Sequence, residues 1–205
     1  MKAYVKAYVS ISGERVTVNG EDFPVRREEG KSWLADIYAA VGCQYPKFFK
    51  MDNLCKTGFL AAELLMGKLS LTPEEPKKDW SVILLSRSGS LDDDKAYQKT
   101  IASADDYFPS PAVFVYTLSN IVTGEIAIRH KIMSESCCYV TETFTPENAY
   151  TLSMNGFLPE KEIKHQIFGW CEYLDGNLSA KLYALSTEAD GALGEWKGEV
   201  MAADK

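Results

Sequence analysis

The chain opens on an alternation of apolar and polar residues, which is typical of a strand with one buried face. Residues 3–11 read Ala-Tyr-Val-Lys-Ala-Tyr-Val-Ser-Ile, and residues 15–18 read Arg-Val-Thr-Val. The second stretch leads into Asn19-Gly20, a dipeptide strongly favoured in two-residue hairpin turns. The sequence therefore predicts a long first strand and a small N-terminal hairpin.

Apolar residues then recur every three or four positions between residues 46 and 68, which is the spacing of a helix. Two such stripes lie side by side, so the predicted helix has a wide apolar face and is deeply buried. A second long helix is expected over residues 111–131. It ends in Arg129, His130 and Lys131, basic side chains that suit the unpaired carbonyls of a helix end.

Further elements alternate along the rest of the chain. Residues 80–85 form a continuous apolar run, which indicates a strand covered on both faces. Strands are also expected over residues 136–141, 166–173 and 178–186, with helices beginning near residue 91 and spanning 146–158. We therefore predict an α/β fold over residues 1–205 as a single domain. We expect a mixed sheet of roughly five strands with helices packed on it. The small N-terminal hairpin is an insertion added to this sheet.

Composition narrows the possible functions. A net charge of −7 leaves no basic excess for nucleic acid or anionic membranes. No signal peptide or stretch of about 20 apolar residues is present, so a cytoplasmic protein without a membrane span is expected. The five cysteines show no CxxC spacing, which favours reduced core thiols over a metal site; they are Cys43, Cys55, Cys137, Cys138 and Cys171.

Two segments resemble the β-ketoacyl synthase family. Residues 50–56, Lys-Met-Asp-Asn-Leu-Cys-Lys, are similar to the "RMDPLSR" segment that opens an early helix in these enzymes. Ser110-Pro111, then Asn120, Gly124 and the apolar residues 126–128, resemble a second family pattern without a gap. The resemblance implies a thiolase-like fold, of which this chain matches the N-terminal half. The small hairpin has no clear counterpart in the family.

The same register reaches the family's nucleophile elbow, "TACxxG", at residues 141–146. There Thr143 falls on the nucleophilic cysteine, Glu142 replaces a small residue, and Pro146 falls on the turn glycine. Farther on, Gly169 and Glu172 lie near the family's glycine-rich strand and glutamate. The site is therefore expected to be degenerate, with no catalytic residue, cofactor or metal.

The two histidines and Thr143 also favour a structural interpretation over a catalytic one. In the family, two histidines from the second half serve the cysteine, whereas this chain holds only His130 and His165. His130 is expected at a helix end and His165 at the surface or a strand edge. A threonine hydroxyl needs an adjacent strong base to act as a nucleophile. Acyl transfer through Thr143, or through a thiol at Cys137 or Cys138, remains an alternative.

A half-length member would expose surfaces that the family buries. The helix over residues 146–158 is rich in apolar side chains, and the family dimerises through the strand at 136–141. The interface candidates are Tyr139, Tyr150, Met154 and Phe157.

Our leading hypothesis is a non-catalytic ketosynthase-like subunit, similar to a chain length factor. It would form a homodimer, or a heterodimer with a ketosynthase, in fatty acid, polyketide or aryl-polyene type biosynthesis, with an acyl carrier protein as a further partner. Two alternatives remain: residual 3-oxoacyl-ACP synthase (acyltransferase) activity with groups supplied in trans, or an acyl- or carrier-binding module.

Overall fold

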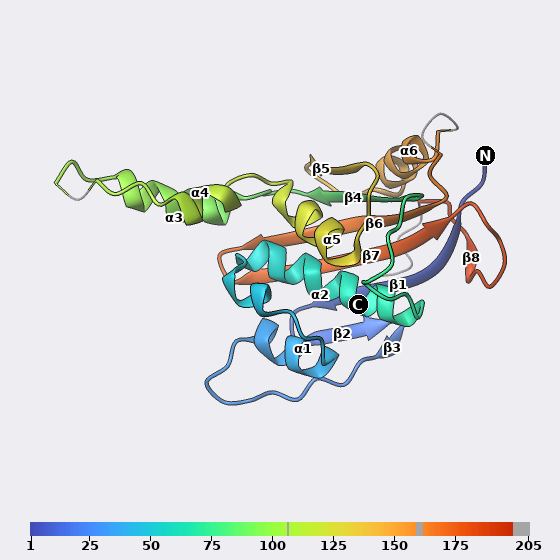
Figure 1. Ribbon diagram of the computed structural model, residues 1–205, viewed down its shortest axis with the longest axis horizontal. Coiled ribbons are helices and arrows are strands. Elements are labelled where there is room, and N and C mark those ends of the chain that lie inside the picture. Colours follow the sequence, from blue (N-terminus) through green and yellow to red (C-terminus); the bar gives the residue numbers. More distant parts are fainter. Residues whose placement is uncertain (106, 159–161, 199–205) are drawn as a thin grey trace.

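The strands form one mixed sheet in a computed structural model that describes residues 1–105, 107–158 and 162–198 (Figure 1). The strand order is β3-β2-β1-β7-β6-β4-β5, and β8 pairs with the start of β1. The strands are β1 (Tyr4–Ser12), β2 (Arg15–Val18), β3 (Glu21–Asp22), β4 (Trp80–Ser86), β5 (Ser136–Val140), β6 (His165–Leu174), β7 (Asn177–Ser186) and β8 (Gly194–Glu195). β4 runs parallel to β5 and β6, and the other pairs are antiparallel.

The predicted mixed α/β architecture is confirmed: the five predicted strands are β1, β4, β5, β6 and β7, and the predicted hairpin supplies β2 and β3. Among the described residues, the strand that was not predicted is β8, which has two residues. Strands this short leave too little alternation to be recognised from sequence.

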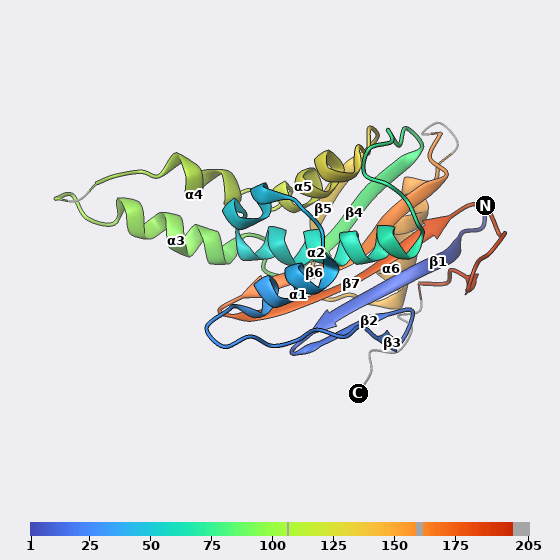
Figure 2. The same cartoon turned by 60° about the horizontal axis from the view of Figure 1, so that its bottom comes forward.

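Helices cover both faces of the sheet, as Figures 1 and 2 show. Residues of α1, α2 and α5 share one core with β1, β4, β6 and β7, whereas α6 packs over a second core on the opposite face. The helices are α1 (Trp33–Val41), the 3₁₀ helix η1 (Pro46–Lys50), α2 (Asn53–Lys68), α3 (Leu91–Ile101), α4 (Pro111–Tyr116), α5 (Ile121–His130) and α6 (Pro146–Gly156).

The strand β4 lies within the sheet and is buried along its whole length, as predicted. Successive side chains of a strand point to opposite faces. Val82 and Leu84 accordingly enter the first core, while Ile83 and Leu85 enter the second. The continuous apolar run is therefore explained by helices on both faces.

The predicted helix over residues 46–68 is two elements, η1 and α2. Asp52 separates them because its backbone is extended, with φ −68° and ψ 174°. Its carboxylate accepts hydrogen bonds from the amides of Leu54 and Cys55, at 2.9 and 3.2 Å. An N-cap requires this extended backbone, so one continuous helix was the wrong prediction.

The predicted helix over residues 111–131 is likewise divided, into α4 and α5. The Thr117 hydroxyl donates a hydrogen bond to the Phe114 carbonyl at 2.7 Å, and the Ser90 hydroxyl donates one to the Thr117 carbonyl. These hydroxyls occupy carbonyls that a continuing helix would use.

The helix α1 was not predicted, although Ser32 caps its start and Gly42, with φ 71°, ends it.

The hairpin prediction is confirmed at Asn19-Gly20, which joins β2 to β3. Both residues have positive φ, 53° and 85°, as a type I′ turn requires. The Asn19 side chain also accepts a hydrogen bond from the Tyr8 amide at 2.9 Å. The turn is therefore tied to the first strand.

The helices α3 and α4 form an arm, residues 91–105 and 107–116, that projects away from the sheet in both views (Figures 1 and 2). No described residue of either helix is buried. The arm exposes large apolar side chains, among them Tyr107, Phe108, Phe114 and Val115.

Within the described residues, no helix is long and apolar enough to span a membrane.

Candidate functional site

The turn between β5 and α6 holds the residues predicted to replace the nucleophile elbow. Thr143 is exposed in this turn, and its carbonyl accepts a hydrogen bond from Asn148 Nδ2 at 2.7 Å. Thr145 and Asn148 form a capping box, with hydrogen bonds of 2.9 and 3.3 Å. Pro146 occupies the first turn of α6, where its missing N–H costs nothing. The turn is thus organised as an ordinary helix start, with Glu142 exposed beside it.

Both histidines lie at the other end of the parallel strands. His165 pairs with Trp80 at the start of β4, whereas the strand leading to Thr143 ends opposite Ser86. Six residues of strand separate these positions, about 20 Å at 3.3 Å per residue. His130 ends α5, before β5 begins, and is buried. Neither imidazole serves as a base for Thr143.

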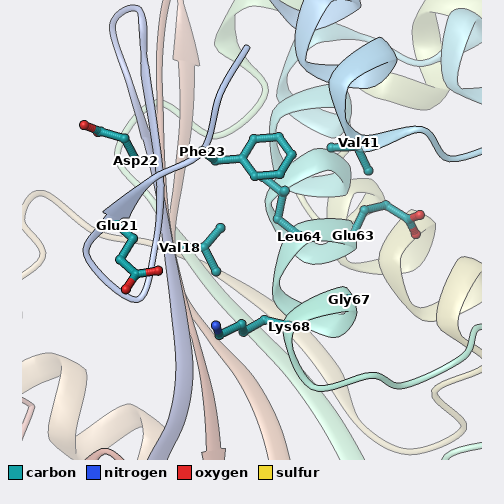
Figure 3. A pocket seen from close by; sticks show the side chains of 9 residues that line it. All are labelled: Val18, Glu21, Asp22, Phe23, Val41, Glu63, Leu64, Gly67 and Lys68. Carbon is teal, nitrogen blue, oxygen red and sulfur yellow. The ribbon is translucent and has the colours of Figure 1, made fainter.

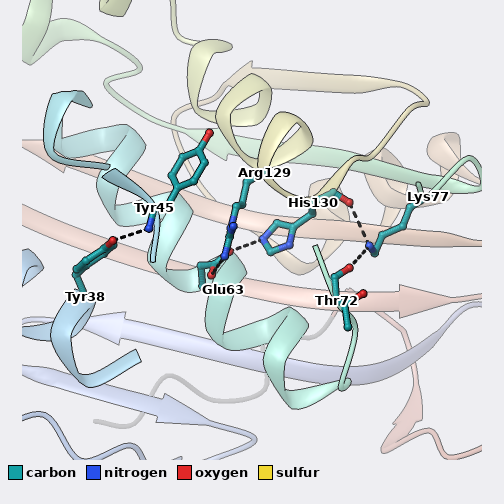
Figure 4. Close-up of polar contacts among 7 residues, drawn as sticks. All are labelled: Tyr38, Tyr45, Glu63, Thr72, Lys77, Arg129 and His130. Atoms are coloured by element: carbon teal, nitrogen blue, oxygen red, sulfur yellow. Dashed lines mark hydrogen bonds and ion pairs between the residues drawn. The ribbon is translucent and has the colours of Figure 1, made fainter. Parts of the chain in front are cut away.

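His130 belongs to a buried polar cluster, shown in Figure 4, that joins α2 to α5. The Glu63 carboxylate accepts hydrogen bonds from Arg129 at 2.8 and 3.0 Å and lies 3.1 Å from His130 Nε2. Burial favours the neutral acid, but His130 and Arg129 outweigh it and lower the pKa of Glu63 to about 2. The structural interpretation of His130 is supported by these contacts.

His165 stacks on Trp80, with ring centroids 5.0 Å apart, and lines a hollow of about 330 Å³. Burial lowers the pKa of this imidazole. The negative charge of Asp79 acts in the opposite direction and raises it, but burial has the larger effect. The sequence placed His165 at the surface or an edge strand. It is instead half-buried on an interior strand.

The Cys138 thiol, close to the turn, is poorly suited to nucleophilic chemistry. Cys138 is half-buried in β5, and burial raises the pKa of its thiol to about 11. Burial likewise raises the pKa of Cys55 and of Cys171. Because the thiolate is the reactive form, Cys138 is almost wholly unreactive at neutral pH.

Glu172 accepts several hydrogen bonds close to this turn. The family resemblance singled out this residue but assigned it no role. Its carboxylate accepts hydrogen bonds from Ser86 Oγ at 3.0 Å and from the amide of Arg87 at 2.7 Å. The hydroxyl and amide of Ser88 bind the same group. The Ser86 carbonyl in turn accepts a hydrogen bond from the Thr141 amide at 2.8 Å. Glu172 therefore organises the turn after β4, and its two oxygens are occupied.

A cavity of about 360 Å³ lies between the added hairpin and α2, on a different part of the molecule (Figure 3). Val18 and Phe23 from the hairpin side face Leu64, and Glu21 and Lys68 lie at its lower edge. The cavity arises where the hairpin covers α2 incompletely.

The interface candidates differ in exposure. Tyr139 and Tyr150 are 38% and 40% exposed, and Met154 is half-buried. Phe157 is 1% exposed, because its ring enters the second core at the end of α6. Phe157 was therefore wrongly included as a surface residue, since one side of the helix end faces the sheet.

The strand β5 forms one edge of the sheet, and β4 is its partner among the described strands. Val140 at its end is 62% exposed. The arm begins close to this point: a side-chain carbon added at Gly89 would lie 2.5 Å from Ser119 Oγ and 3.3 Å from a Val140 methyl. The end of the β5 edge therefore lies close to the root of the arm.

Comparison with known proteins gives structural relatives only. No protein-family model matches the sequence, and no curated protein matches it. A solved ishigamide ketosynthase/chain length factor is similar with TM-score 0.65 and 12% identity, over 95% of this chain and 64% of that chain. A ketosynthase in complex with its chain length factor from Xenorhabdus doucetiae gives TM-score 0.58 and 12% identity, over 93% of this chain and 81% of that chain.

A third relative is a type II polyketide synthase acyl carrier protein in complex with its ketosynthase bound to the hexaketide. It gives TM-score 0.61 and 11% identity, over 90% of this chain and 62% of that chain. The chain therefore spans less than two thirds of the first and third relatives. With the mixed sheet and its helical layers, these matches show that the chain has the thiolase-like fold of ketosynthases and chain length factors.

Proposed function

We propose that this chain is a non-catalytic ketosynthase-like subunit, folded as one domain, that associates with a ketosynthase. The observation that carries the proposal is the exposed surface of the β5 edge, whose end lies close to the root of the arm. An unpaired edge strand invites pairing with another chain, and exposed apolar side chains favour its burial. Tyr139, Val140 and Leu118 supply the apolar groups of this surface.

The chemistry of the turn supports a role without catalysis. Thr143 has no imidazole at its end of the sheet among the described residues, and Cys138 is held as a neutral thiol. Cys138 also lies on the strand β5, within the proposed interface. We therefore favour association over residual acyl transfer.

One structural relative supports a heterodimer in particular. It matches 93% of this chain over 81% of its own, and it belongs to a complex of a ketosynthase with its chain length factor. We propose the same kind of partner here, in fatty acid, polyketide or aryl-polyene type biosynthesis, with a homodimer as the second possibility and an acyl carrier protein as a further partner.

The test measures association directly. Light scattering of the purified chain, alone and mixed with a ketosynthase from its own source, should show a 1:1 complex in the mixture. The variant Val140→Lys places a charge on the β5 edge and should weaken the complex at least tenfold. The matched control Ile128→Lys changes an equally exposed residue, 64% against 62%, on the helix α5. Equal affinity of both variants, or no complex, would refute the proposal.

A further inference from the structure

The cavity between the hairpin and α2 lies at the opposite edge of the sheet from β5, because β2 and β3 end the strand order on that side. Its volume of about 360 Å³ falls in the range of about 300–1,000 Å³ that is usual for small-molecule sites. A ligand in this cavity would leave the proposed ketosynthase interface uncovered. Binding here and association at β5 therefore do not exclude each other.

Two walls form the cavity, and each presents apolar and charged residues. Val18 and Glu21 are partners across β2 and β3, so their side chains lie on the same face of the hairpin. Leu64, Gly67 and Lys68 are three or four residues apart on α2, which places them on one side of that helix. Figure 3 shows Val18 and Leu64 on opposite walls, with Glu21 and Lys68 at the lower edge. The cavity thus has an apolar interior and a charged rim.

Four charged residues line the cavity, and two of them already have partners. The Asp22 carboxylate pairs with Arg15 at 2.7 Å. The Glu63 carboxylate pairs with Arg129 at 2.8 Å, and Figure 3 shows it turned away from the hairpin. Both carboxylates are therefore neutralised by basic side chains, and one acid and one base remain at the rim.

Glu21 and Lys68 carry these remaining charges, which are opposite in sign and lie on opposite walls. Both residues are exposed, and neither forms an ion pair within residues 1–105, 107–158 and 162–198. A ligand that carries both an anionic and a cationic group satisfies the two side chains at once. Because exposed ion pairs contribute little affinity, the apolar interior must supply the rest. The site therefore fits a ligand with a small zwitterionic head and an apolar body.

We propose that this cavity binds a small apolar α-amino acid, with its ammonium on Glu21 and its carboxylate on Lys68. The side chain of the amino acid lies between Phe23 and Leu64. An α-amino acid joins both charges to one apolar group within a few bonds, as the size of the cavity requires. The hairpin wall is in place before the ligand binds, because the Phe23 amide donates a hydrogen bond to the Val16 carbonyl at 2.8 Å.

Methyl NMR of the isolated chain tests binding at this site. L-Phenylalanine is the probe, because the ring current of its phenyl group shifts the signals of nearby methyl groups. Saturable shifts are expected at the methyls of Val18, Val41 and Leu64, which line the cavity. The methyls of Val115, on the arm, should not move. No saturable shift at the three cavity residues would refute the proposal.

Two analogues test the role of the charged rim. 3-Phenylpropionate lacks the ammonium group and phenethylamine lacks the carboxylate. Each should bind about fivefold more weakly than L-phenylalanine, because each loses one ion pair at an exposed site. Equal affinities for the three compounds would contradict recognition of an amino acid.

Substitutions assign the binding to this cavity. A side-chain carbon added at Gly67 meets no atom within 4 Å, so Gly67→Leu should fill the cavity and abolish binding. Gly124→Leu, on α5, has the same open space outside the cavity and should bind as the unaltered chain does. Lys68→Ala should weaken binding about fivefold, whereas Lys50→Ala, an exposed lysine outside the cavity, should not. Thermal unfolding checks that each variant is folded, and undiminished binding in Gly67→Leu or in Lys68→Ala would overturn the proposal.

Discussion

Arg129 donates two hydrogen bonds to the Glu63 carboxylate, from Nε at 2.8 Å and from Nη2 at 3.0 Å, across the contact between α5 and α2. His130 approaches the same carboxylate from the next position. The side chain of Glu63 is 8% exposed and that of Arg129 17%, so the pair lies out of water. Figure 4 places Tyr45 beside Arg129, whose guanidinium lies 5.1 Å from that ring.

Glu63→Ala should destabilise the protein by about 3–5 kcal/mol, because it leaves Arg129 buried without its partner. Urea unfolding measures the loss. Asp22→Asn, which breaks an exposed pair with Arg15, serves as the control and should cost less than about 1 kcal/mol. Similar losses in the two variants would show that the buried pair contributes little.

Acid should remove the stability that Glu63 contributes. Its folded pKa of about 2 lies below the ordinary value of 4.5, so its contribution is complete above that value and declines as the pH falls toward 2. The difference in unfolding free energy between the unaltered chain and Glu63→Gln should therefore shrink between pH 5 and pH 2. A difference independent of pH would contradict a charged Glu63.

Gly169→Ala should destabilise the sheet, because an added side-chain carbon would lie 2.0 Å from the Lys181 carbonyl oxygen on β7. Overpacking of this kind typically costs about 1–3 kcal/mol. Gly124→Ala on α5 is the matched control, with open space at the same atom, and should stabilise by about 0.5–1 kcal/mol. Thermal unfolding of both variants distinguishes the close approach from a general effect of the substitution.

Cys138 should react slowly with iodoacetamide. With a pKa raised from 9.0 to about 11, its thiolate fraction at pH 7.5 is about 100-fold below that of an unperturbed cysteine. Peptide mass spectrometry gives the labelling rate of the native chain, and the urea-unfolded chain is the control. Labelling of native Cys138 at the unfolded rate would mean that the thiol is an available nucleophile.

Thr143→Cys should not restore acyl transfer, because His130 and His165 lie at the opposite end of the strands. Intact-mass spectrometry after incubation with an acyl thioester should show no adduct beyond that of Thr143→Ser. An adduct that forms in Thr143→Cys, maps to position 143 and is absent from Thr143→Ser would demonstrate a functional acyl site at this turn.

Sequence alone determined much of the framework. The alternation in β1, the apolar run of β4 and the Asn19-Gly20 turn each reflect local rules, so their elements were predicted correctly. The position of Thr143 in a strand-to-helix turn also followed from register and from Pro146 in the first helical turn. These features depend on residues within a few positions of one another.

Tertiary structure decided the rest. The break after α4 involves a contact from outside the helix, since the Ser90 hydroxyl donates to the Thr117 carbonyl, and the burial of Phe157 depends on which side of α6 meets the sheet. The pairing of Glu63 with Arg129 joins residues far apart in the chain. Hydrophobic periodicity reports only that a face is buried. The partner across that face, and hence the charge that a side chain retains there, is fixed by packing.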